Sequence, residues 1–188
     1  MRLRSLSNDD LWLYEAIHCD LAMMEHVGGP LPREGLAEKL VRDVTSVEAD
    51  RSWVLVIIPD EDPSTAAGTV AVWEHVMDDE TVNEIGWMVL PAFQGRGLGS
   101  QAVRSVLERA RAEGRWSPLH AFPPVTNARS NAMCRKMGSP GSSRGTSPSA
   151  TGSCDATTGA WSSGRPIART SRSRRNPRRP VPRGTDPA

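Results

Sequence analysis

Three glycines alternate with other residues in the segment 89–100, which reads VLPAFQGRGLGS. An apolar run precedes the glycines and a helical pattern follows them, so Gly95, Gly97 and Gly99 are expected in a turn between a buried strand and a helix. Main-chain N–H groups in such a turn can close around an anion, and the helix start adds unpaired amides and a positive dipole end. Arg96 supplies a further charge. The segment predicts a pyrophosphate cradle, although a flexible connecting loop is the plainer interpretation.

Two familiar phosphate loops do not fit this segment. A P-loop has Lys and then Ser or Thr after its last glycine, whereas Leu98, Gly99 and Ser100 include no Lys. A dinucleotide-binding fingerprint has Gly-x-Gly-x-x-Gly directly after the first strand of its fold, whereas these glycines alternate and follow the fourth predicted strand. The cradle therefore belongs to another class.

The elements around the turn follow from the spacing of the apolar residues. Alternation or continuous apolar runs predict strands at residues 1–7, 52–58, 67–75, 82–90 and 119–122. A first helix is predicted after Asn8 or Asp9, with an apolar face made of Leu11, Leu13, Tyr14, Ile17 and Leu21. Further helices are predicted near residues 33–44, 100–113 and 127–137. This order predicts a mixed α/β (α+β) domain with one central sheet.

The sequence changes character after residue 138. Residues 1–138 hold 14 Lys and Arg against 20 Asp and Glu, whereas residues 139–188 hold nine Arg against two Asp. Of those last 50 residues, 43 are Ser, Arg, Pro, Gly, Thr or Ala, which leaves too little apolar surface to offset the entropy of ordering. We therefore expect a folded domain at 1–138 and a low-complexity, disordered tail at 139–188.

Composition also bears on the setting of the chain. No run of apolar residues is long enough to cross a membrane, and the first ten residues lack the apolar core of a secretion signal. Cys19, Cys134 and Cys154 are too far apart to predict a disulfide framework or a zinc site, and the four histidines lack ligand spacing. We expect a cytoplasmic protein with no membrane partner and no metal.

The glycine segment resembles the cofactor motif of the GNAT acetyltransferases, Gln/Arg-x-x-Gly-x-Gly/Ala, at Gln94, Gly97 and Gly99. The surrounding phrase EIGWMVLPAFQGRGLG looks like the family's fourth strand and following loop, and NARSNAMCRKMG, at 127–138, looks like its later helix. The resemblance covers residues 1–138 and includes the branch of ribosomal-protein N-terminal acetyltransferases. It implies a mixed, mostly antiparallel central sheet flanked by helices, and acetyl-CoA as co-substrate.

The resemblance also implies positions for the cofactor. The main chain of Met88, Val89 and Leu90 would pair with the pantetheine arm like an added strand. Asn127 would lie beside that arm, although a helix cap is an alternative role for it. The diphosphate would be held by the amides of Gln94, Gly95, Arg96, Gly97, Leu98, Gly99 and Ser100.

The catalytic residues are likewise implied by the resemblance. Glu84 stands where many members keep the base that takes the proton of the attacking amine, and Cys134 stands where many keep a Tyr that protonates the leaving thiolate. A thiol is a weak donor. The plainer interpretations are an exposed strand residue for Glu84 and a buried helix residue for Cys134. Trp73 and Trp87, on neighbouring predicted strands, are candidates to line an acceptor pocket.

The family has two strands after its last helix, and we expect both to be missing here. A shifted reading frame joins the third base of each codon to the first two bases of the next codon. In that frame Ser139 can become Phe, Leu, Ile or Val. Residues 154–159 can become Leu-Arg-Cys-Asn-His-Trp, which looks like the closing strand of a subgroup of the family. Our hypothesis is the loss of one nucleotide near codon 138. A genuine basic tail is the alternative.

Three functions follow from these observations. The first is acetyl-CoA-dependent N-acetylation of a primary amine on a peptide, a protein or a small molecule. The second is binding of coenzyme A without turnover, by a domain that lacks its last strands. The third is nucleic-acid binding through the arginine-rich residues 165–183, which lack interleaved aromatic residues. The acceptor and the oligomeric state stay open, with a dimer as one option.

Overall fold

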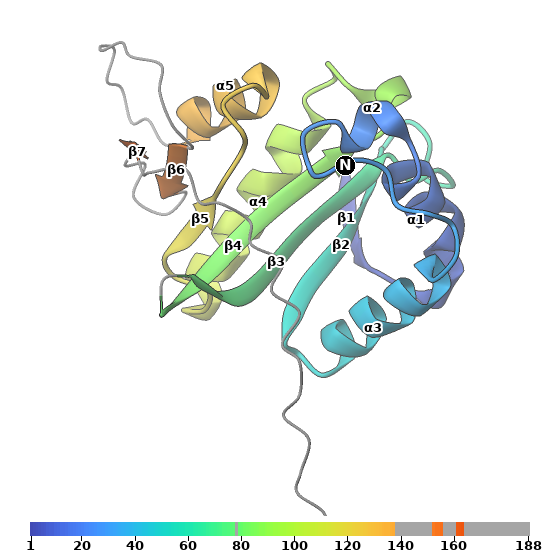
Figure 1. The fold of residues 1–188 in the computed structure, drawn as a ribbon, viewed down its shortest axis with the longest axis horizontal. Helices are drawn as coiled ribbons and strands as arrows, with labels where there is room; N and C mark the ends of the chain where they lie inside the picture. The colour runs from blue at the N-terminus through green and yellow to red at the C-terminus, as the bar shows by residue number, and fades with distance from the viewer. Residues whose placement is uncertain (78, 138–151, 156–160, 164–188) are drawn as a thin grey trace, which may run out of the picture.

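The strands form one twisted sheet, in which they lie side by side in sequence order from β1 to β7. The structure is a computed structural model and describes residues 1–77, 79–137, 152–155 and 161–163. Neighbouring strands are antiparallel except β4 and β5, which are parallel (Figure 1). The strands are β1 (Arg2–Ser5), β2 (Ser52–Ile58), β3 (Gly68–Met77), β4 (Glu80–Val89), β5 (Leu119–Ala121), β6 (Gly152–Asp155) and β7 (Trp161–Ser163).

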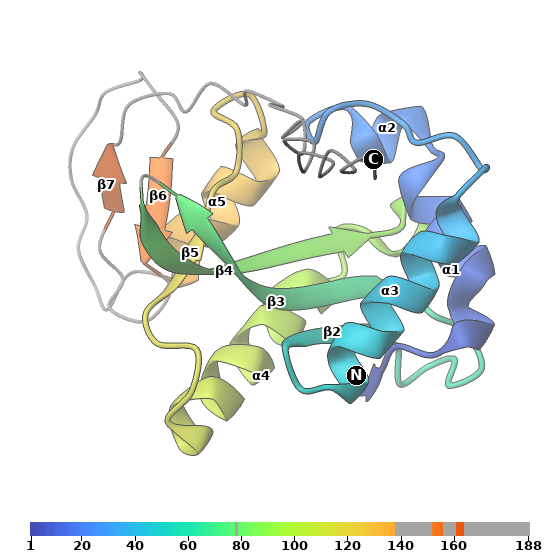
Figure 2. The ribbon, with the colours of Figure 1, turned by 60° about the horizontal axis from the view of Figure 1, so that its bottom comes forward.

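Helices cover both faces of the sheet, and α4 lies on the face opposite α1 and α3 (Figure 2). Two short 3-10 turns, η1 (Asn8–Asp10) and η2 (Pro91–Phe93), precede α1 and α4. The helices are α1 (Leu11–His18), α2 (Leu21–Met24), α3 (Leu36–Glu48), α4 (Leu98–Glu113) and α5 (Ala128–Met137). The sheet therefore separates two apolar core layers, and helices cover each of them.

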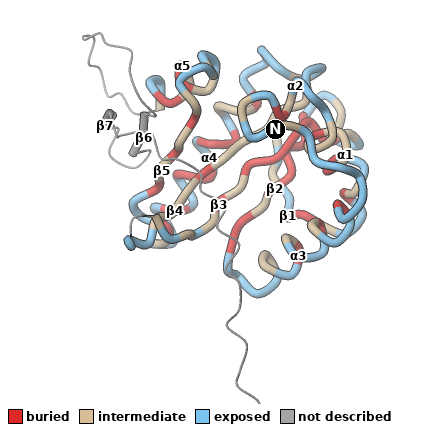
Figure 3. The backbone as a smooth tube through the Cα atoms, in the orientation of Figure 1, coloured by how far each residue is buried: buried red, intermediate tan, exposed pale blue. Residues whose placement is uncertain are grey.

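Side chains that alternate along each strand contribute to both core layers. On β2, Leu55 and Ile57 pack toward α4, whereas Val56 and Ile58 pack toward α1 and α3. Figure 3 shows the buried positions gathered on the strands and on the helix sides that face them. The continuous apolar run of β2 thus reflects a strand that is covered on both faces, as the sequence predicts.

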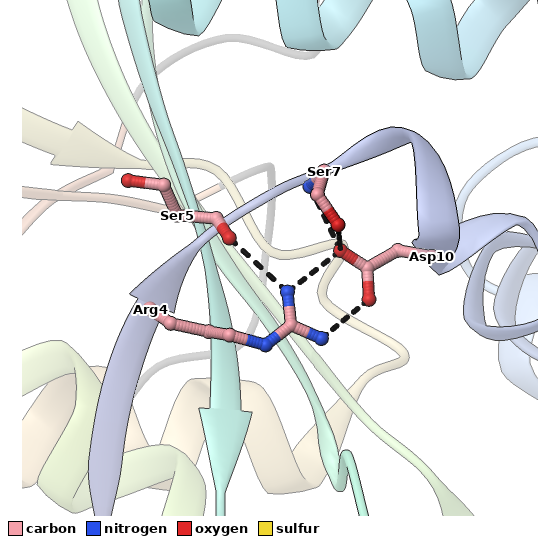
Figure 4. A network of polar contacts seen from close by, with 4 residues as sticks. All are labelled: Arg4, Ser5, Ser7 and Asp10. Carbon is pink, nitrogen blue, oxygen red and sulfur yellow. Dashed lines mark hydrogen bonds and ion pairs between the residues drawn. The ribbon is translucent and has the colours of Figure 1, made fainter.

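The N-terminus is fixed by a buried carboxylate. Asp10 is 1% exposed, and its carboxylate accepts two hydrogen bonds from the guanidinium of Arg4 and others from the N–H and Oγ of Ser7 (Figure 4). Burial raises the pKa of Asp10, but the bonds from Arg4 and Ser7 outweigh it and lower the pKa below the ordinary value. This network joins β1 to the start of α1.

Two sequence predictions differ from the fold. The first predicted helix was extended to Leu21, but α1 ends at His18 and Leu21 is 71% exposed on α2. The reason is Asp20, whose side chain accepts a hydrogen bond from the N–H of Met23 at 2.8 Å and so starts a new helix. The helix predicted near 33–44 is α3, which begins and ends later.

The end of the sheet also differs from expectation. The sequence predicts no strand after residue 138, yet β6 pairs with β5, and β7 pairs with β6, within the predicted tail. Both strands are short, at four and three residues. A β5 edge without a neighbour would present unpaired main-chain groups, which an extended segment satisfies regardless of its composition. The rest of the predicted tail lies outside the described residues.

Candidate active site

The site begins where β4 and β5 separate. Their parallel pairing is confined to Asn83 with Leu119 and Glu84 with His120, so the later residues of β4 have β3 on one side and no described strand on the other. Main-chain groups of alternate residues point to opposite edges of a strand. The carbonyl of Met88 faces Gly68 of β3, because a Cβ added to Gly68 would lie 2.0 Å from that oxygen. Val89, one residue on, therefore faces the open edge.

This alternation distinguishes the three residues predicted to pair with a pantetheine arm. The N–H of Leu90 donates to the carbonyl of Ala67 at 2.8 Å, so it is turned toward the β3 side, as is the carbonyl of Met88. Of the three, only Val89 has its main chain on the open edge. Trp87 shares that orientation by alternation and was not predicted.

The predicted glycine turn connects this edge to α4. Gly95 and Gly97 have φ angles of 78° and 79°, in the left-handed region that favours glycine. The first bond of α4 runs from the N–H of Gln101 to the carbonyl of Gly97, which leaves the amides of Leu98, Gly99 and Ser100 without partners inside the helix. Within the described part of the chain, these three amides also meet no other recorded acceptor.

Gly99 is needed for a different reason. A Cβ at this position would lie 3.3 Å from Cγ2 of Val89 and 3.9 Å from Sδ of Met133 on α5. The missing side chain therefore lets the first turn of α4 lie against the end of β4. Strand edge and helix start are thus held side by side.

The side chain of Gln94 fixes the turn to the strand. Its Nε2 donates to the carbonyl oxygen of Val89 at 2.9 Å, and its Oε1 accepts a hydrogen bond from Arg129 of α5. Arg96 contacts Glu61, with 3.7 Å between Nη1 and Oε1, and its guanidinium lies over the ring of Phe93. Two arginines, Arg96 and Arg129, therefore accompany the turn, and only Arg96 was predicted.

A cavity of about 580 Å³ lies next to the open edge. It reaches Met88 on β4 and Asn127 and Ser130 at the start of α5, but the turn 94–100 does not line it. Its other walls come from α1, α2 and the residues after it, α3, the strands and the segment after β5, and they include Tyr14, His18, Lys39, Asp43, Trp73, Glu84 and Trp87. The strand edge with the glycine turn and the cavity are therefore two adjoining compartments.

Glu84 lies in the wall of the cavity beside aromatic side chains. Trp73 is its partner across the β3–β4 ladder, and both tryptophans predicted as candidate pocket residues, Trp73 and Trp87, line the cavity. A Cβ on Gly86 would lie 3.0 Å from the indole of Trp73, so this glycine leaves room for the ring. On the neighbouring strand β3, Nδ1 of His75 lies 3.5 Å from Oε2 of Glu84.

The opposite wall carries a polar cluster that the sequence analysis missed. The hydroxyl of Tyr14 and the ammonium of Lys39 both donate to Oδ2 of Asp43, at 2.7 and 2.6 Å. Burial, followed by the bond to Asp43, raises the pKa of Tyr14. Burial, followed by the charge of Lys39, lowers the pKa of His18 to about 4, so His18 is neutral near pH 7. The spacing of Lys39 and Asp43 was the available signal, because residues four apart meet on a helix.

The two remaining predicted residues lie on or beside α5. Asn127 caps this helix, because its Oδ1 accepts the N–H of Ser130 at 3.0 Å, and it also lines the cavity. Cys134 is 2% exposed, packs in the core layer beneath α4 and does not line the cavity. The structure thus brings Glu84 and Asn127 to the cavity and leaves Cys134 behind its wall.

Solved acetyltransferases share this arrangement of elements. The ribosomal L7/L12 α-N-protein acetyltransferase RimL in complex with coenzyme A is 17% identical, with a TM-score of 0.60 over 71% of this chain and 76% of that one. The Salmonella typhimurium enzyme that modifies the N-terminal serine of L7/L12 is 16% identical, with a TM-score of 0.59 over 71% and 77%. Vibrio cholerae spermidine N-acetyltransferase, with CoA and spermine, is 15% identical, with a TM-score of 0.60 over 72% and 78%.

These similarities confirm the fold class, a mixed and mostly antiparallel sheet flanked by helices. Residues 1–139 also match the family described as acetyltransferase (GNAT) domain. The chain belongs to the GNAT family of N-acetyltransferases, as the motif at Gln94, Gly97 and Gly99 predicted. No helix among the described residues is long and apolar enough to span a bilayer.

Proposed function

We propose that this protein transfers the acetyl group of acetyl-CoA to a primary amine. The main support for this proposal is that three features lie next to one another. They are an open main-chain edge at Val89, unpaired amides at the start of α4, and an adjoining cavity with Glu84 in its wall. A thioester arm along the edge and an amine in the cavity could then meet near the end of β4. This division supports a reaction between two substrates.

The turn 94–100 is the proposed site for the diphosphate. Three amides of α4 and the positive end of its dipole attract an anion there. Arg96 and Arg129 add charge that can form bonds with phosphate oxygens. RimL and the spermidine enzyme, which share this fold, were each solved with CoA. We therefore propose Gln94 and Arg129 as supports of the turn, in addition to the predicted main-chain contacts.

Glu84 is proposed as the base. The attacking amine must be neutral, so its ammonium loses a proton to the carboxylate of Glu84. The nitrogen then forms a bond to the acetyl carbon, the carbon–sulfur bond breaks, the nitrogen releases its surplus proton, and the thiolate of coenzyme A takes up a proton. Glu84 suits this role because it lies in the cavity wall rather than on the surface, next to Trp73 and Trp87.

Cys134 stays a prediction as the acid that protonates the thiolate. One RimL structure holds a disulfide between coenzyme A and a cysteine, so in that protein a thiol reaches the thiol of the cofactor. Against the role here, Cys134 is buried and lies outside the cavity. Replacement by Ser keeps a small donor and replacement by Ala removes it, so a lower kcat in Cys134→Ala alone would support the role.

Two acceptor classes fit the cavity, the N-terminal amine of a peptide and a small polyamine. Neighbours in structure act on each, namely RimL on a protein and the Vibrio enzyme on spermidine. Asp43 and Glu84 offer two carboxylates, but Lys39 already pairs with Asp43, which leaves the cavity less acidic than a polyamine with several charges favours. We therefore propose the singly charged amine of a peptide or small molecule.

The test is release of coenzyme A by the full chain with a panel of N-terminal peptides and polyamines. We expect turnover with at least one amine, a loss of kcat of at least about 100-fold in Glu84→Gln, and an unchanged KM for acetyl-CoA. Glu74→Gln, on the neighbouring strand and exposed, is the matched control. Saturable binding of acetyl-CoA without release across the panel would instead favour a CoA-binding protein without turnover.

The arginine-rich tail raises a separate question, because residues 165–183 lie outside the described residues. Nucleic-acid binding through this segment and a lost nucleotide near codon 138 both stay hypotheses. Sequencing the gene around that codon decides the second. Retention on a DNA or RNA column that survives deletion of residues 139–188 would exclude the tail as the cause of binding.

A further inference from the structure

The carboxylate of Glu84 has a titratable neighbour on the adjoining strand. Nδ1 of His75, on β3, lies 3.5 Å from Oε2 of Glu84 on β4. The His75 side chain is 32% exposed although its Nδ1 is buried, so the exposed part of the ring is the part farther from Glu84. Within the described residues the buried Nδ1 makes no hydrogen bond, and its 3.5 Å contact with Oε2 is a few tenths of an ångström longer than one.

Neighbouring rings limit the orientation of His75. Phe122, which follows β5 and lines the cavity, meets the His75 ring edge-on with centroids 6.5 Å apart. The same phenyl ring stacks on His120, at 6.1 Å, and His120 is the β5 residue in register with Glu84. The titratable groups of the adjoining strands that neighbour Glu84 are therefore His75 from β3 and His120 from β5.

We propose that His75 is the positioning residue of the acceptor site. Its Nδ1–H donates to Oε2 of Glu84, which orients the carboxylate so that the other oxygen can take the proton of the amine. This inference rests on the proposed role of Glu84 as base. The tautomer of a histidine is set by the bond that one nitrogen makes, and a carboxylate favours the Nδ1–H form.

Two substitutions separate a positioning role from a structural one. His75→Gln keeps an N–H donor, so we expect a kcat near that of the unmodified chain. His75→Phe keeps the ring shape without a donor, so we expect a kcat lower by on the order of tenfold, with the KM for acetyl-CoA unchanged. His120→Phe, on β5, is the matched control and should lower kcat less than His75→Phe does.

The experiment measures kcat and the KM for acetyl-CoA of the full chain and its variants at one pH, combined with ¹⁵N NMR of the His75 ring. A kcat of His75→Phe equal to that of the unmodified chain, or an equal loss of kcat in His75→Gln and His75→Phe, would overturn the proposal. If the unmodified chain shows no turnover, the proposed function fails, but the NMR result still decides this contact. An Nδ1–H tautomer that changes in Glu84→Gln supports it, and an Nε2–H tautomer unaffected by that change overturns it.

Discussion

The side-chain amide of Gln94 donates to the carbonyl oxygen of Val89 at 2.9 Å, and so ties the glycine turn to the open edge of β4. Gln94 thus acts through its side chain on the strand rather than on a ligand. The hydrogen bond from Arg129 extends the connection to α5. Side-chain hydrogen bonds thus connect strand, turn and helix, and such a connection would reduce the entropy lost on binding of the proposed cofactor.

Loss of this connection should weaken cofactor binding. Gln94→Met removes the donor to Val89 and the acceptor for Arg129 without adding a charge, and one hydrogen bond is worth about 1 kcal/mol, so the Kd for acetyl-CoA should rise by at least about fivefold. Calorimetric titration measures the effect. Gln101→Ala, on the first turn of α4, is the control and should leave Kd within about twofold. Equal effects of the two changes would show that the bond to Val89 is not the cause.

The two ends of α4 offer a test of the glycine turn. Gly97 and Gly114 both have positive φ, 79° and 62°, so alanine at either position costs roughly 1–2 kcal/mol of folding stability. Thermal melting should therefore show a similar loss for Gly97→Ala and Gly114→Ala. Only Gly97→Ala should weaken acetyl-CoA binding, because Gly97 lies at the N-terminal end of the helix. Weaker binding in both variants would mean that general destabilisation is responsible.

Stability should depend on pH through His18. The pKa of His18 is lowered to about 4 by burial and by Lys39, so the folded state holds the neutral ring more firmly than the unfolded chain does. This contribution is complete above about pH 6.5 and is lost as the pH falls from there toward 4, with an upper limit of about 3 kcal/mol. Urea unfolding measured across this range should show a slope that His18→Gln removes. An identical slope in the variant would contradict the prediction.

Asp10 should contribute in a more acidic range. Its pKa is lowered by Arg4 and Ser7 in spite of its burial, so its contribution is present above about pH 4 and is lost as the pH falls through the folded-state pKa. At neutral pH, Asp10→Asn should cost about 1–3 kcal/mol of unfolding free energy, because Arg4 loses its charged partner. The exposed neighbour Asp9 provides the control, and Asp9→Asn should change stability by less than about 0.5 kcal/mol.

Local patterns were enough to predict most of the sheet and the glycine turn. The run at 52–58 is β2 with the same bounds, since a strand covered on both faces is apolar throughout. The turn at Gly95 and Gly97 was predictable because positive φ angles favour glycine, and glycine is visible in the sequence. Leu21 was misplaced because Asp20 is both a tolerable helix residue and a helix cap, and only the fold decides between the two.

The cavity was harder to predict because its polar residues come from distant parts of the chain. Tyr14 and Asp43 are 29 residues apart, and His75 reaches Glu84 only through the register of a hairpin. The orientation of Met88, Val89 and Leu90 depends on the parity of the β3–β4 ladder, which one residue of register reverses. Apolar spacing alone does not specify these relationships.

Calorimetric titration of the full chain with acetyl-CoA and with pantetheine tests the central claim most directly. If the amides at the start of α4 bind the diphosphate, acetyl-CoA binds at one site with a Kd between about 1 μM and 1 mM, and pantetheine, which lacks the diphosphate, binds at least about tenfold more weakly. Gly97→Ala should then reduce the affinity for acetyl-CoA without changing that for pantetheine. Equal affinity for the two ligands, or no binding of acetyl-CoA, would contradict the account.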